Sequence, residues 1–588
     1  MKKIPKISQN KKQIADKNKL IATSVFNNKL RMLKSAMSES INKEALNIDC
    51  DDIEEDTQYT IFISLSDGKS RARVCHTSDA DYDNAWKKVA KLANDLVDRY
   101  KIKPVWVKAD IVDVVQKVKF RDVKTAFLSL KYEKFFRKGV SLDSKMKMAF
   151  LESEANSYKL YDYTMLPSSK WKEGDDLVPW FNVKQAVQYL EWNDKKDFPF
   201  LEPNAYFFDC RSFFLDTDGK VYELYKYGTN CGRRIQDEVD GDFVKNILTT
   251  SSQYLTRQLN ADGRYIYGYF PSFNSVMKSY NILRHAGTTW SLMCAYDVTK
   301  DGSLVPTINR TIDYLISQIR YKDDETAFLL EEKSQEFKLG GIGIAILTLS
   351  KYMETFGDKD YSDIIRKLAN GIISLQDPNS GKLTHVLNAV DFSVKEAFRT
   401  VYYDGESSYA LTKAYEITGD IEYLNAARLS IDYFIEKNYI QYRDHWLAYA
   451  MNAFTMHVKE EKYITFALKN AWENLDKIYN QPTSYHTYLE LLMETYDLYL
   501  RLKEGGCEIE YFRSIDESRI IDTIKHRAWH MLDGYFYPEY AMYMSKPDSI
   551  VGSFFVRHDG FRDRIDDNQH FIDGYAKYYK IMCNRNVN

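Results

Sequence analysis

Apolar and polar residues alternate with a helical period through the second part of this 588-residue chain, and the pattern repeats. Each unit consists of an apolar helix that opens with glycine or other small residues, a short turn and a second helix with one charged face. Three copies of this unit lie at residues 287–316, 341–373 and 405–435, and residues 445–475 and 485–502 continue the series less exactly. Residues 573–582 supply one more helix.

Helical hairpins of this kind cannot bury their apolar faces alone, so consecutive hairpins stack into an array. The first helix of each pair is apolar nearly all round and is predicted to be an inner helix. The second helix is amphipathic and is predicted to lie outside it. The fold class predicted from this pattern is mainly α: a C-terminal (α/α) toroid of about six helical hairpins over residues 244–588, preceded by small α+β modules.

The chain before residue 244 shows other patterns. Residues 1–50 form a basic arm with helical periodicity, and this arm is either a tail leading into an amphipathic helix or a membrane-surface or docking arm. Residues 51–118 combine a hairpin that turns at Asp67 and Gly68, a helix and a further strand, which indicates a small α+β domain. Residues 119–243 are a mixed α+β segment with a second hairpin and a polar linker.

Composition narrows the classes of function. The net charge is −3, so the overall charge favours neither nucleic acid nor an anionic membrane as a partner. The 7 cysteines form no Cys-x-x-Cys pair, which disfavours a zinc site or a disulfide framework and is typical of a reducing compartment. There is no apolar run long enough to span a membrane and no signal peptide, so we expect a soluble cytoplasmic protein without a membrane span. The 45 tyrosines suit a sugar-binding cleft and suit a core equally well.

Polar and ionisable residues collect immediately before the predicted inner helices. Because the inner helices of a toroid run parallel, all their N-termini open at one end, and these segments are predicted to meet around one funnel. The segments are residues 280–287, 336–343, 398–407, 442–446, 483–490 and 564–570.

A ring of helix N-termini favours an anion, because unpaired N–H groups and the helix dipoles point toward it. Guanidinium groups suit carboxylates, and five arginines lie at or near this funnel: Arg284, Arg399, Arg443, Arg557 and Arg564. The predicted ligand is therefore an acidic sugar such as a uronate. The alternative is that the arginines pair with Asp404, Asp444, Asp566 and Asp567 and only hold the loops.

Several residues at these helix starts have chemistry of their own. His285 lies next to the small residues Ala286 and Gly287 and is predicted either to transfer protons or bind ligand, or to pack at a helix end. Tyr402, Tyr403, Asp404 and Glu406 form a second cluster, in which Asp404 could instead be an N-cap and Glu406 a first-turn acid. His445 and His486 could be ligand contacts or core histidines.

The most charged segment precedes the last helix. Asp566 or Asp567 is a plausible N-cap, and either carboxylate could orient His570, three or four residues on, for acid–base work. His526 and His530 stand at i and i+4 without an acidic residue between them, and no metal-binding motif is present. We therefore predict no metal and no cofactor.

The units typified by residues 418–435, TGDIEYLNAARLSIDYFI, resemble those of a large group of carbohydrate-active (α/α) toroid proteins. That group includes N-acylglucosamine 2-epimerases, uronyl C5-epimerases, polysaccharide lyases and unsaturated-uronyl hydrolases. The resemblance is architectural and covers about residues 244–588. Helical hairpins also build prenyl-transferring and lanthionine-forming toroids, but the cysteine and histidine zinc ligands of those proteins are not evident in this sequence.

The resemblance implies proton abstraction and return on an acidic sugar, with His285 and His570 as the two acid–base groups, as paired histidines are in the 2-epimerases. Tyr402 or Tyr403 is an alternative acid–base group. A hydrolase or lyase would instead use Glu406 and Asp567. A third possibility is a non-catalytic glycan-binding or assembly protein of polysaccharide biosynthesis, with a protein partner on its N-terminal modules. The substrate-binding residues expected are Tyr280, Asn281, Arg284, Arg399, Asp404, Arg443, His445, His486, Arg557, Arg564, Asp566 and Gln569.

Overall fold

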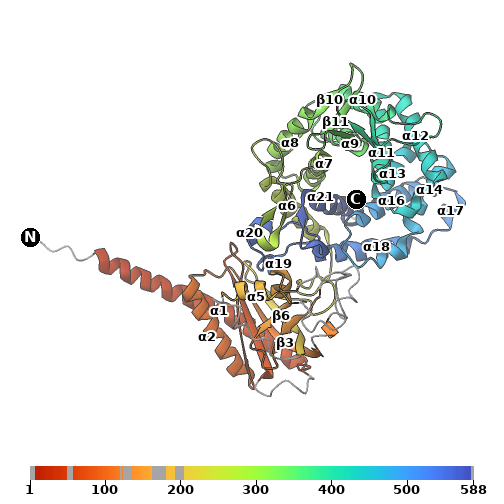
Figure 1. Ribbon diagram of the computed structural model, residues 1–588. Coiled ribbons are helices and arrows are strands. Elements are labelled where there is room, and N and C mark those ends of the chain that lie inside the picture. Colours follow the sequence, from red (N-terminus) through yellow and green to blue (C-terminus); the bar gives the residue numbers. More distant parts are fainter. Residues whose placement is uncertain are drawn as a thin grey trace, which may run out of the picture.

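A sheet domain and a ring of helices make up the molecule (Figure 1). The computed structural model describes residues 7–48, 57–119, 122–123, 136–161, 181–191 and 204–584. The parts of the predicted domains at residues 1–6, 49–56, 120–121, 124–135, 162–180, 192–203 and 585–588 lie outside the described residues. None of the described helices is both long enough and apolar enough to cross a membrane.

One antiparallel sheet dominates the first domain. In the described part of the chain its strands run in the order β2-β1-β3-β6-β4-β5, with β7 paired to β6. The long strands β3 and β6 pair along their whole length, so residues on both sides of position 118 contribute to one sheet. The strands are β1 (Tyr59–Ser66), β2 (Arg73–Asp79), β3 (Trp106–Lys119), β4 (Gly139–Ser141), β5 (Ala149–Phe150), β6 (Asn204–Leu215) and β7 (Val221–Glu223).

The two hairpins of this sheet turn where the sequence predicts. Asp67 accepts hydrogen bonds from the backbone N–H groups of Lys69 and Ser70, and Gly68 adopts a φ of 78° that a glycine tolerates without strain. The hairpin of β6 and β7 turns at Asp218 and Gly219, and this glycine has a φ of 79°. The domain limits at residues 118 and 243 remain a prediction.

Two helices cover one face of the sheet, α1 (Ile7–Lys43) and α2 (Tyr82–Tyr100). Phe26, Leu30, Leu33 and Met37 recur at the spacing of one helix face and pack with α2 and the strands into one buried cluster. The second half of α1 is therefore part of the core of this domain. Two short helices, α4 (Glu152–Ser157) and α5 (Val183–Tyr189), complete its regular structure in the described residues.

Six inner helices form a closed ring in the second domain. Each packs against the next, in the order α7-α9-α11-α13-α16-α21, and α21 packs back against α7 (Figure 1). They are α7 (Ile282–Thr299), α9 (Leu339–Thr355), α11 (Tyr402–Thr418), α13 (His445–His457), α16 (Thr487–Glu504) and α21 (Ile565–Tyr578). The predicted (α/α) toroid is confirmed.

Six outer helices alternate with the inner ones along the chain. In α10, Ile365, Leu368, Ala369 and Ile372 are buried at the i, i+3, i+4, i+7 spacing, and the other face is polar. The inner α9, by contrast, is buried at every position from Leu339 to Ser350. The outer helices are α6 (Gly241–Arg257), α8 (Val305–Ser317), α10 (Ser362–Ile373), α12 (Ile421–Glu436), α14 (Glu461–Trp472) and α18 (Glu517–His530).

Short elements fill the connections between the helices of the ring. Two small antiparallel sheets form there, with the strand orders β10-β11-β12-β13-β14 and β15-β8-β9. Their strands are β8 (Gly268–Phe270), β9 (Ser275–Val276), β10 (Ile319–Tyr321), β11 (Ala327–Glu331), β12 (Glu336–Lys338), β13 (Val386–Asn388), β14 (Val394–Glu396) and β15 (Asp563–Arg564). The short helices are η5 (Pro271–Phe273), η6 (Gly302–Leu304), η7 (Tyr439–Tyr442), α15 (Leu475–Tyr479), α17 (Glu510–Arg513) and η10 (Tyr579–Cys583).

The connection from α18 to α21 joins the two domains. We call residues 531–564 the docking segment, and it contains η8 (Met531–Gly534), α19 (Pro538–Ala541), α20 (Pro547–Ile550) and η9 (Arg557–Asp559). Met542 and Tyr543 are buried in a cluster with the sheet residues Phe62 and Phe208. The backbone N–H of Ala72 donates to the carbonyl of Met542 at 2.7 Å. The last hairpin of the toroid is thereby anchored on the sheet domain.

Candidate functional site

A cavity of about 460 Å³ lies at the N-terminal ends of the inner helices. We call it the N-terminal pocket. Segments that lie far apart in the sequence form its wall, as expected from the parallel inner helices. The predicted site residues that line it are Asn281, Arg284, Tyr402, Tyr403, Glu406, His445, His486, Asp566, Gln569 and His570.

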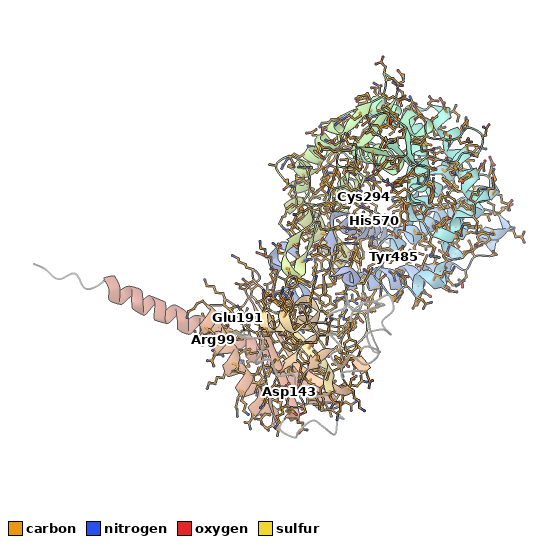
Figure 2. All side chains as sticks on the ribbon, in the orientation of Figure 1. Arg99, Asp143, Glu191, Cys294, Tyr485 and His570 are labelled. Atoms are coloured by element: carbon orange, nitrogen blue, oxygen red, sulfur yellow. The ribbon has the colours of Figure 1, made fainter. Side chains whose placement is uncertain are left out.

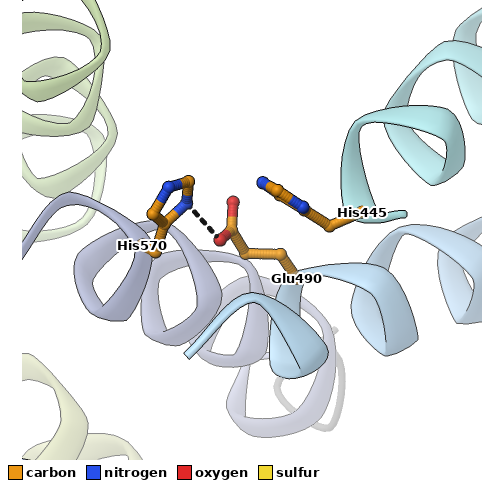
Figure 3. A group of neighbouring side chains, drawn as sticks. All are labelled: His445, Glu490 and His570. Carbon is orange, nitrogen blue, oxygen red and sulfur yellow. Dashed lines mark hydrogen bonds and ion pairs between the residues drawn. The ribbon is translucent and has the colours of Figure 1, made fainter. Parts of the chain in front are cut away.

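Three histidines meet on one side of this pocket. The rings of His486 and His570 stack with centroids 5.1 Å apart, and the ring of His445 meets His570 edge-on at 4.9 Å. Nδ1 of His570 lies 2.8 Å from Oε1 of Glu490, on the neighbouring inner helix α16 (Figure 3). His570 projects inside the ring of helices (Figure 2). Since Glu490 engages one nitrogen of His570, the other nitrogen, Nε2, is left for the pocket.

The three imidazoles are neutral at ordinary pH. Burial lowers the pKa of His570 to about 3, and the nearby guanidinium of Arg284 acts in the same direction. Burial and the proximity of His570 lower the pKa of His486 to about 3 and that of His445 well below its usual value. In the described part of the chain, neither ring nitrogen of His445 has a hydrogen-bond partner. A neutral imidazole with a free nitrogen can accept a proton from a ligand.

Glu406 contributes a carboxyl group to the wall. It is buried, and among the described residues its Oε2 has no hydrogen-bond partner. Burial, with the neighbouring Asp444 carboxylate, raises the pKa of Glu406 well above its usual value. Gly340 of α9 makes room for this group, because a Cβ at position 340 would lie 1.9 Å from Oε2 of Glu406. Gly340, in the first turn of the second inner helix, thus serves the packing of the pocket.

Arginines and aspartates form ion pairs beside His570, whose Nε2 lies 3.7 Å from Oδ1 of Asp566. Arg284 pairs with Asp566, and Arg564 pairs with both Asp566 and Asp567. Arg562 also binds Asp567, at 3.1 Å. Burial alone would raise the pKa of Asp567, but the guanidinium groups of Arg564 and Arg562 lower this pKa to about 2. Asp567 and Arg564 therefore stabilise the wall from behind, and neither is among the residues that line the pocket.

The structure does not bring His285 to the pocket. Its Nε2 lies 2.9 Å from the carbonyl oxygen of Thr311 on the outer helix α8, and its Nδ1 lies 2.7 Å from the hydroxyl of Tyr280. The side chain is fully buried, and burial lowers the pKa of His285 to about 4. His285 thus connects the inner helix α7 to the outer helix α8, and Tyr280 holds its other ring nitrogen. These contacts fit the alternative of a histidine that packs at a helix end.

Four other predicted residues also lie away from the lining. Asp404 is buried between His385 and Tyr439, whose Nε2 and hydroxyl each lie 3.1 Å from it. Arg399 binds Glu336 and Glu396. Arg443 donates to the hydroxyl of Tyr488 at 3.2 Å, and Arg557 lies in a separate cavity. For Asp404, Arg399 and Arg443 the alternative of a loop-holding role fits the observed contacts better than ligand binding does.

Sequence reasoning missed other parts of the wall. Trp446, Tyr485, Arg562 and His558 line the pocket, and Glu490 lies directly behind it. Trp446 follows His445 in a segment already singled out, so its aromatic ring could have been included. Arg562 belongs to the docking segment, which has no helical period, and no signal in the sequence placed it.

His445, Glu490 and His570 could together hold a metal ion. The ligand atoms of His445, Glu490 and His570 lie within 4.8 Å of one another, and no other such group exists in the described residues (Figure 3). Two histidines and a glutamate are a known zinc ligand set. The rings of His526 and His530 stack with centroids 5.8 Å apart on α18, outside this group. Glu490 also accepts a hydrogen bond from the hydroxyl of Tyr449 at 3.1 Å, and the absence of a metal remains a prediction.

A second cavity of about 500 Å³ lies at the opposite ends of the inner helices. Cys294, which also projects inside the ring in Figure 2, is in its wall. Its charged groups are largely paired with one another, as in the contacts of Lys577 with Glu494 and Asp497. Trp290, Tyr449 and Trp446 pack together between the two cavities.

No family model matches the chain, and no curated protein matches it. Among solved structures, the chain is similar to a D-mannose isomerase, with 11% identity and a TM-score of 0.44 over 59% of this chain and 100% of the other. It is also similar to a cellobiose 2-epimerase from Bacillus thermoamylovorans B4167, with 13% identity and a TM-score of 0.44 over 58% of this chain and 99% of the other. A third similar structure is an unsaturated glucuronyl hydrolase specific for heparin, with 13% identity and a TM-score of 0.41 over 58% of this chain and 98% of the other. The likeness is confined to architecture.

Proposed function

We propose that this chain is a carbohydrate-active enzyme of the epimerase or isomerase kind, which removes and returns a proton on an acidic sugar. The observation that supports this proposal is the meeting of two buried, neutral imidazoles, His445 and His570, in a pocket that also contains Arg284. Aromatic rings and hydroxyl groups from several inner helices supply the remaining wall, which suits a sugar ring.

Arg284 is the group proposed to bind the carboxylate of the sugar. Its guanidinium pairs with Asp566, which Arg564 also binds, so a substrate carboxylate would share Arg284 with Asp566. Pairing with a guanidinium stabilises the negative charge that develops on a carboxylate when the adjacent C–H bond loses its proton. An anion bound beside the histidines also raises the pKa of each imidazole from its low value in the empty pocket. Binding of the substrate therefore prepares the bases.

The proton transfer needs one base on each face of the carbon. One imidazole takes the proton and leaves the electron pair delocalised into the carboxylate, and the other returns a proton to the opposite face. Glu490 holds Nδ1 of His570 and directs Nε2 toward the reaction, while neither ring nitrogen of His445 has a hydrogen-bond partner among the described residues. This assignment replaces His285 by His445 as the second acid–base group. Glu406 can donate a hydrogen bond to a sugar oxygen when its carboxyl group is protonated, the form that its raised pKa favours.

The hydrolase and lyase alternative needs Glu406 and Asp567 to act on the same bond. Asp567 is bound by two arginines and is not among the lining residues, which favours proton transfer over hydrolysis by this pair. The non-catalytic alternative needs no reactive groups in the pocket. It gives no reason for three neutral histidines to be buried together there, since each loses hydration by burial.

The test is incubation with uronic acid sugars and glycans in deuterated water, followed by mass spectrometry and NMR. Deuterium at the carbon next to the carboxylate is the expected result. New reducing ends would indicate hydrolysis, and absorbance from an unsaturated uronate would indicate elimination. Binding with none of these products would point to the glycan-binding alternative.

Single variants sharpen the test. With two bases, His445→Asn and His570→Asn should each lower epimerisation by about 10²- to 10⁴-fold. Each variant should still exchange deuterium into one epimer of the substrate only, and the two variants should differ in which epimer exchanges. His526→Asn is the matched control, because His526 lies on α18 outside the N-terminal pocket and stacks on Tyr479. Unchanged epimerisation in both pocket variants would contradict the assignment.

A further inference from the structure

A small cavity of about 50 Å³ lies beside the N-terminal pocket, and we call it the side cavity. Thr483, Ser484 and His558 line both cavities, so the two are neighbours along one wall. Arg137 of the sheet domain and Arg557 of the docking segment line the side cavity. We propose that the side cavity binds a second anionic group of the substrate, a carboxylate or sulfate on the sugar next to the one in the N-terminal pocket. This inference rests on the proposed function for the nature of the ligand.

Arg557 supplies an uncompensated positive charge. In the described part of the chain it has no ion pair, and its buried Nη2 has no hydrogen-bond partner. Its guanidinium instead lies over the rings of Tyr540, Phe555 and Phe561, at 4.8, 5.2 and 5.2 Å from their centroids. Aromatic faces hold this cation in position without neutralising it.

The other charges around the side cavity are paired. Arg137 lies 2.9 Å from Glu152, and Arg233 lies 3.1 Å from Asp533, whose carboxylate also lines the cavity. The opposite charges cancel within each of these two ion pairs, so the positive charge of Arg557 remains uncompensated. Burial and the nearby Arg137 guanidinium both lower the pKa of Arg557. An anion between Arg137 and Arg557 would relieve this repulsion and satisfy the unpartnered N–H group.

The size of the side cavity limits what can enter. A volume of about 50 Å³ accommodates a charged substituent and excludes a whole sugar ring. A glycan would therefore keep its reacting ring in the N-terminal pocket and place only the substituent of the next ring here. The hydroxyls of Thr483 and Ser484 lie on the shared wall, where a glycan that crosses from one cavity to the other would contact them.

This arrangement gives the sheet domain a place in substrate binding. Arg137 donates to the carbonyl of Thr229 at 2.9 Å and to that of Cys231, so its backbone partners fix it at the domain boundary. The toroid alone would lack this guanidinium. The sheet domain thus completes the proposed anion site.

The experiment compares binding of two trisaccharides of equal length by calorimetry. One carries a carboxylate on a single terminal uronic acid, and the other carries carboxylates on adjacent sugars. A third ligand with a sulfate in place of the second carboxylate distinguishes the two anionic groups. The expected result is that wild-type protein binds both doubly acidic ligands at least about tenfold more tightly than the singly acidic one.

The variant Arg557→Gln should lose that preference and bind the singly acidic ligand as wild type does. Arg557→Lys should keep part of it, because lysine retains the charge but lacks the planar fork. Arg428→Gln is the control, since Arg428 also lies over a tyrosine ring but on the outer helix α12. Thermal melting of each variant checks its folding.

Three outcomes overturn the inference. They are no preference in wild type, an unchanged preference in Arg557→Gln, or an equal loss of affinity for singly and doubly acidic ligands in that variant. Failure of the proposed function has a different signature, namely a preference that depends on Arg557 in a protein that exchanges no deuterium. The two ideas can therefore fail separately.

Discussion

Single residues decide the shape of the N-terminal pocket. Gly340 and Gly341 are adjacent on α9, yet their surroundings differ. A Cβ at position 340 would lie 1.9 Å from Glu406 Oε2 and 2.4 Å from the ring of Tyr403, whereas at position 341 the nearest atom is 3.6 Å away. Only the first glycine is needed for close approach.

We expect Gly340→Ala to lower the free energy of unfolding by about 1–3 kcal/mol, because the methyl group displaces Glu406 and Tyr403. Sugar binding should weaken with it. Gly341→Ala is the matched control and should be neutral or stabilising by up to about 1 kcal/mol, since alanine is a better helix residue than glycine. Denaturant titration of both variants tests the pair. Equal effects of the two substitutions would refute the packing argument.

His285 carries a prediction about pH. The native state keeps it neutral, with a pKa of about 4, while the unfolded chain binds a proton below about pH 6.5. The unfolded state thus binds more protons between these values, and stability falls as the pH drops. The contribution of this residue between pH 7 and pH 5 is about 2 kcal/mol.

The measurement for His285 is the change in unfolding free energy between pH 7 and pH 5, in wild type and in His285→Gln. Glutamine can keep a hydrogen bond to Thr311 but does not titrate, so the variant should lose less stability over this range. The comparison of slopes cancels the contributions of the other buried histidines. A variant with the slope of wild type would contradict a neutral His285.

At the scale of elements, the inner helices and their common direction follow from sequence. Small and apolar residues all round a helix predict an inner position, and the structure has six such helices with their N-termini around one pocket. Which side chain faces the pocket is harder to predict. On a helix each residue turns the direction by about 100°, so His285 points to α8 while Arg284, next to it, lines the pocket.

Contacts between distant segments limited the prediction further. Glu490 lies one turn inside α16 and acquires its role only because His570 of α21 packs against it, 80 residues away in sequence. The pairing of Asp567 with Arg562 and Arg564 likewise depends on the irregular docking segment. No periodicity encodes either contact, so the ring of helices was predictable and the partners within it were not.

The start of α13 carries a prediction at this scale. Asp444 is its N-cap and accepts hydrogen bonds from the backbone N–H groups of Trp446 and Leu447 at 3.0 and 3.3 Å. We expect Asp444→Ala to cost about 0.5–2 kcal/mol of stability, and Asp444→Asn to cost much less because asparagine is a good N-cap. Since the cap positions His445, proton exchange should fall in the alanine variant as well.

A second N-cap separates the loss of stability from the loss of proton exchange. Asp420 caps the outer helix α12 through the N–H of Glu422. Asp420→Ala should lower stability by a similar amount and leave deuterium exchange unchanged, because α12 does not reach the N-terminal pocket. Chemical denaturation and the exchange assay, run on the same preparations, make the comparison. Equal losses of exchange in both alanine variants would mean that general destabilisation, and not the position of His445, is responsible.

At the scale of the whole molecule, the docking segment makes the two domains depend on each other. It belongs to the toroid by sequence, yet Met542 and Tyr543 are buried among residues of the sheet. Arg234 of the sheet domain binds the fully buried Glu539 of this segment at 2.7 Å and also binds Asp216. A carboxylate buried between domains is stable there only while its cation is present.

We therefore predict strong coupling between Arg234 and Glu539. Arg234→Met leaves the buried Glu539 carboxylate without its cation and should cost about 3–5 kcal/mol. Glu539→Gln should cost less because Arg234 keeps Asp216, and the double variant should cost less than the sum of the two single variants. Exposed Lys462 and Asp432, 2.7 Å apart, offer a control pair worth no more than about 1 kcal/mol. The measurement is a double-mutant cycle on the intact chain, in which additive effects would contradict the predicted coupling. Because Arg137 reaches the side cavity from the sheet domain, the same single variants should also weaken binding of doubly acidic glycans more than that of singly acidic ones.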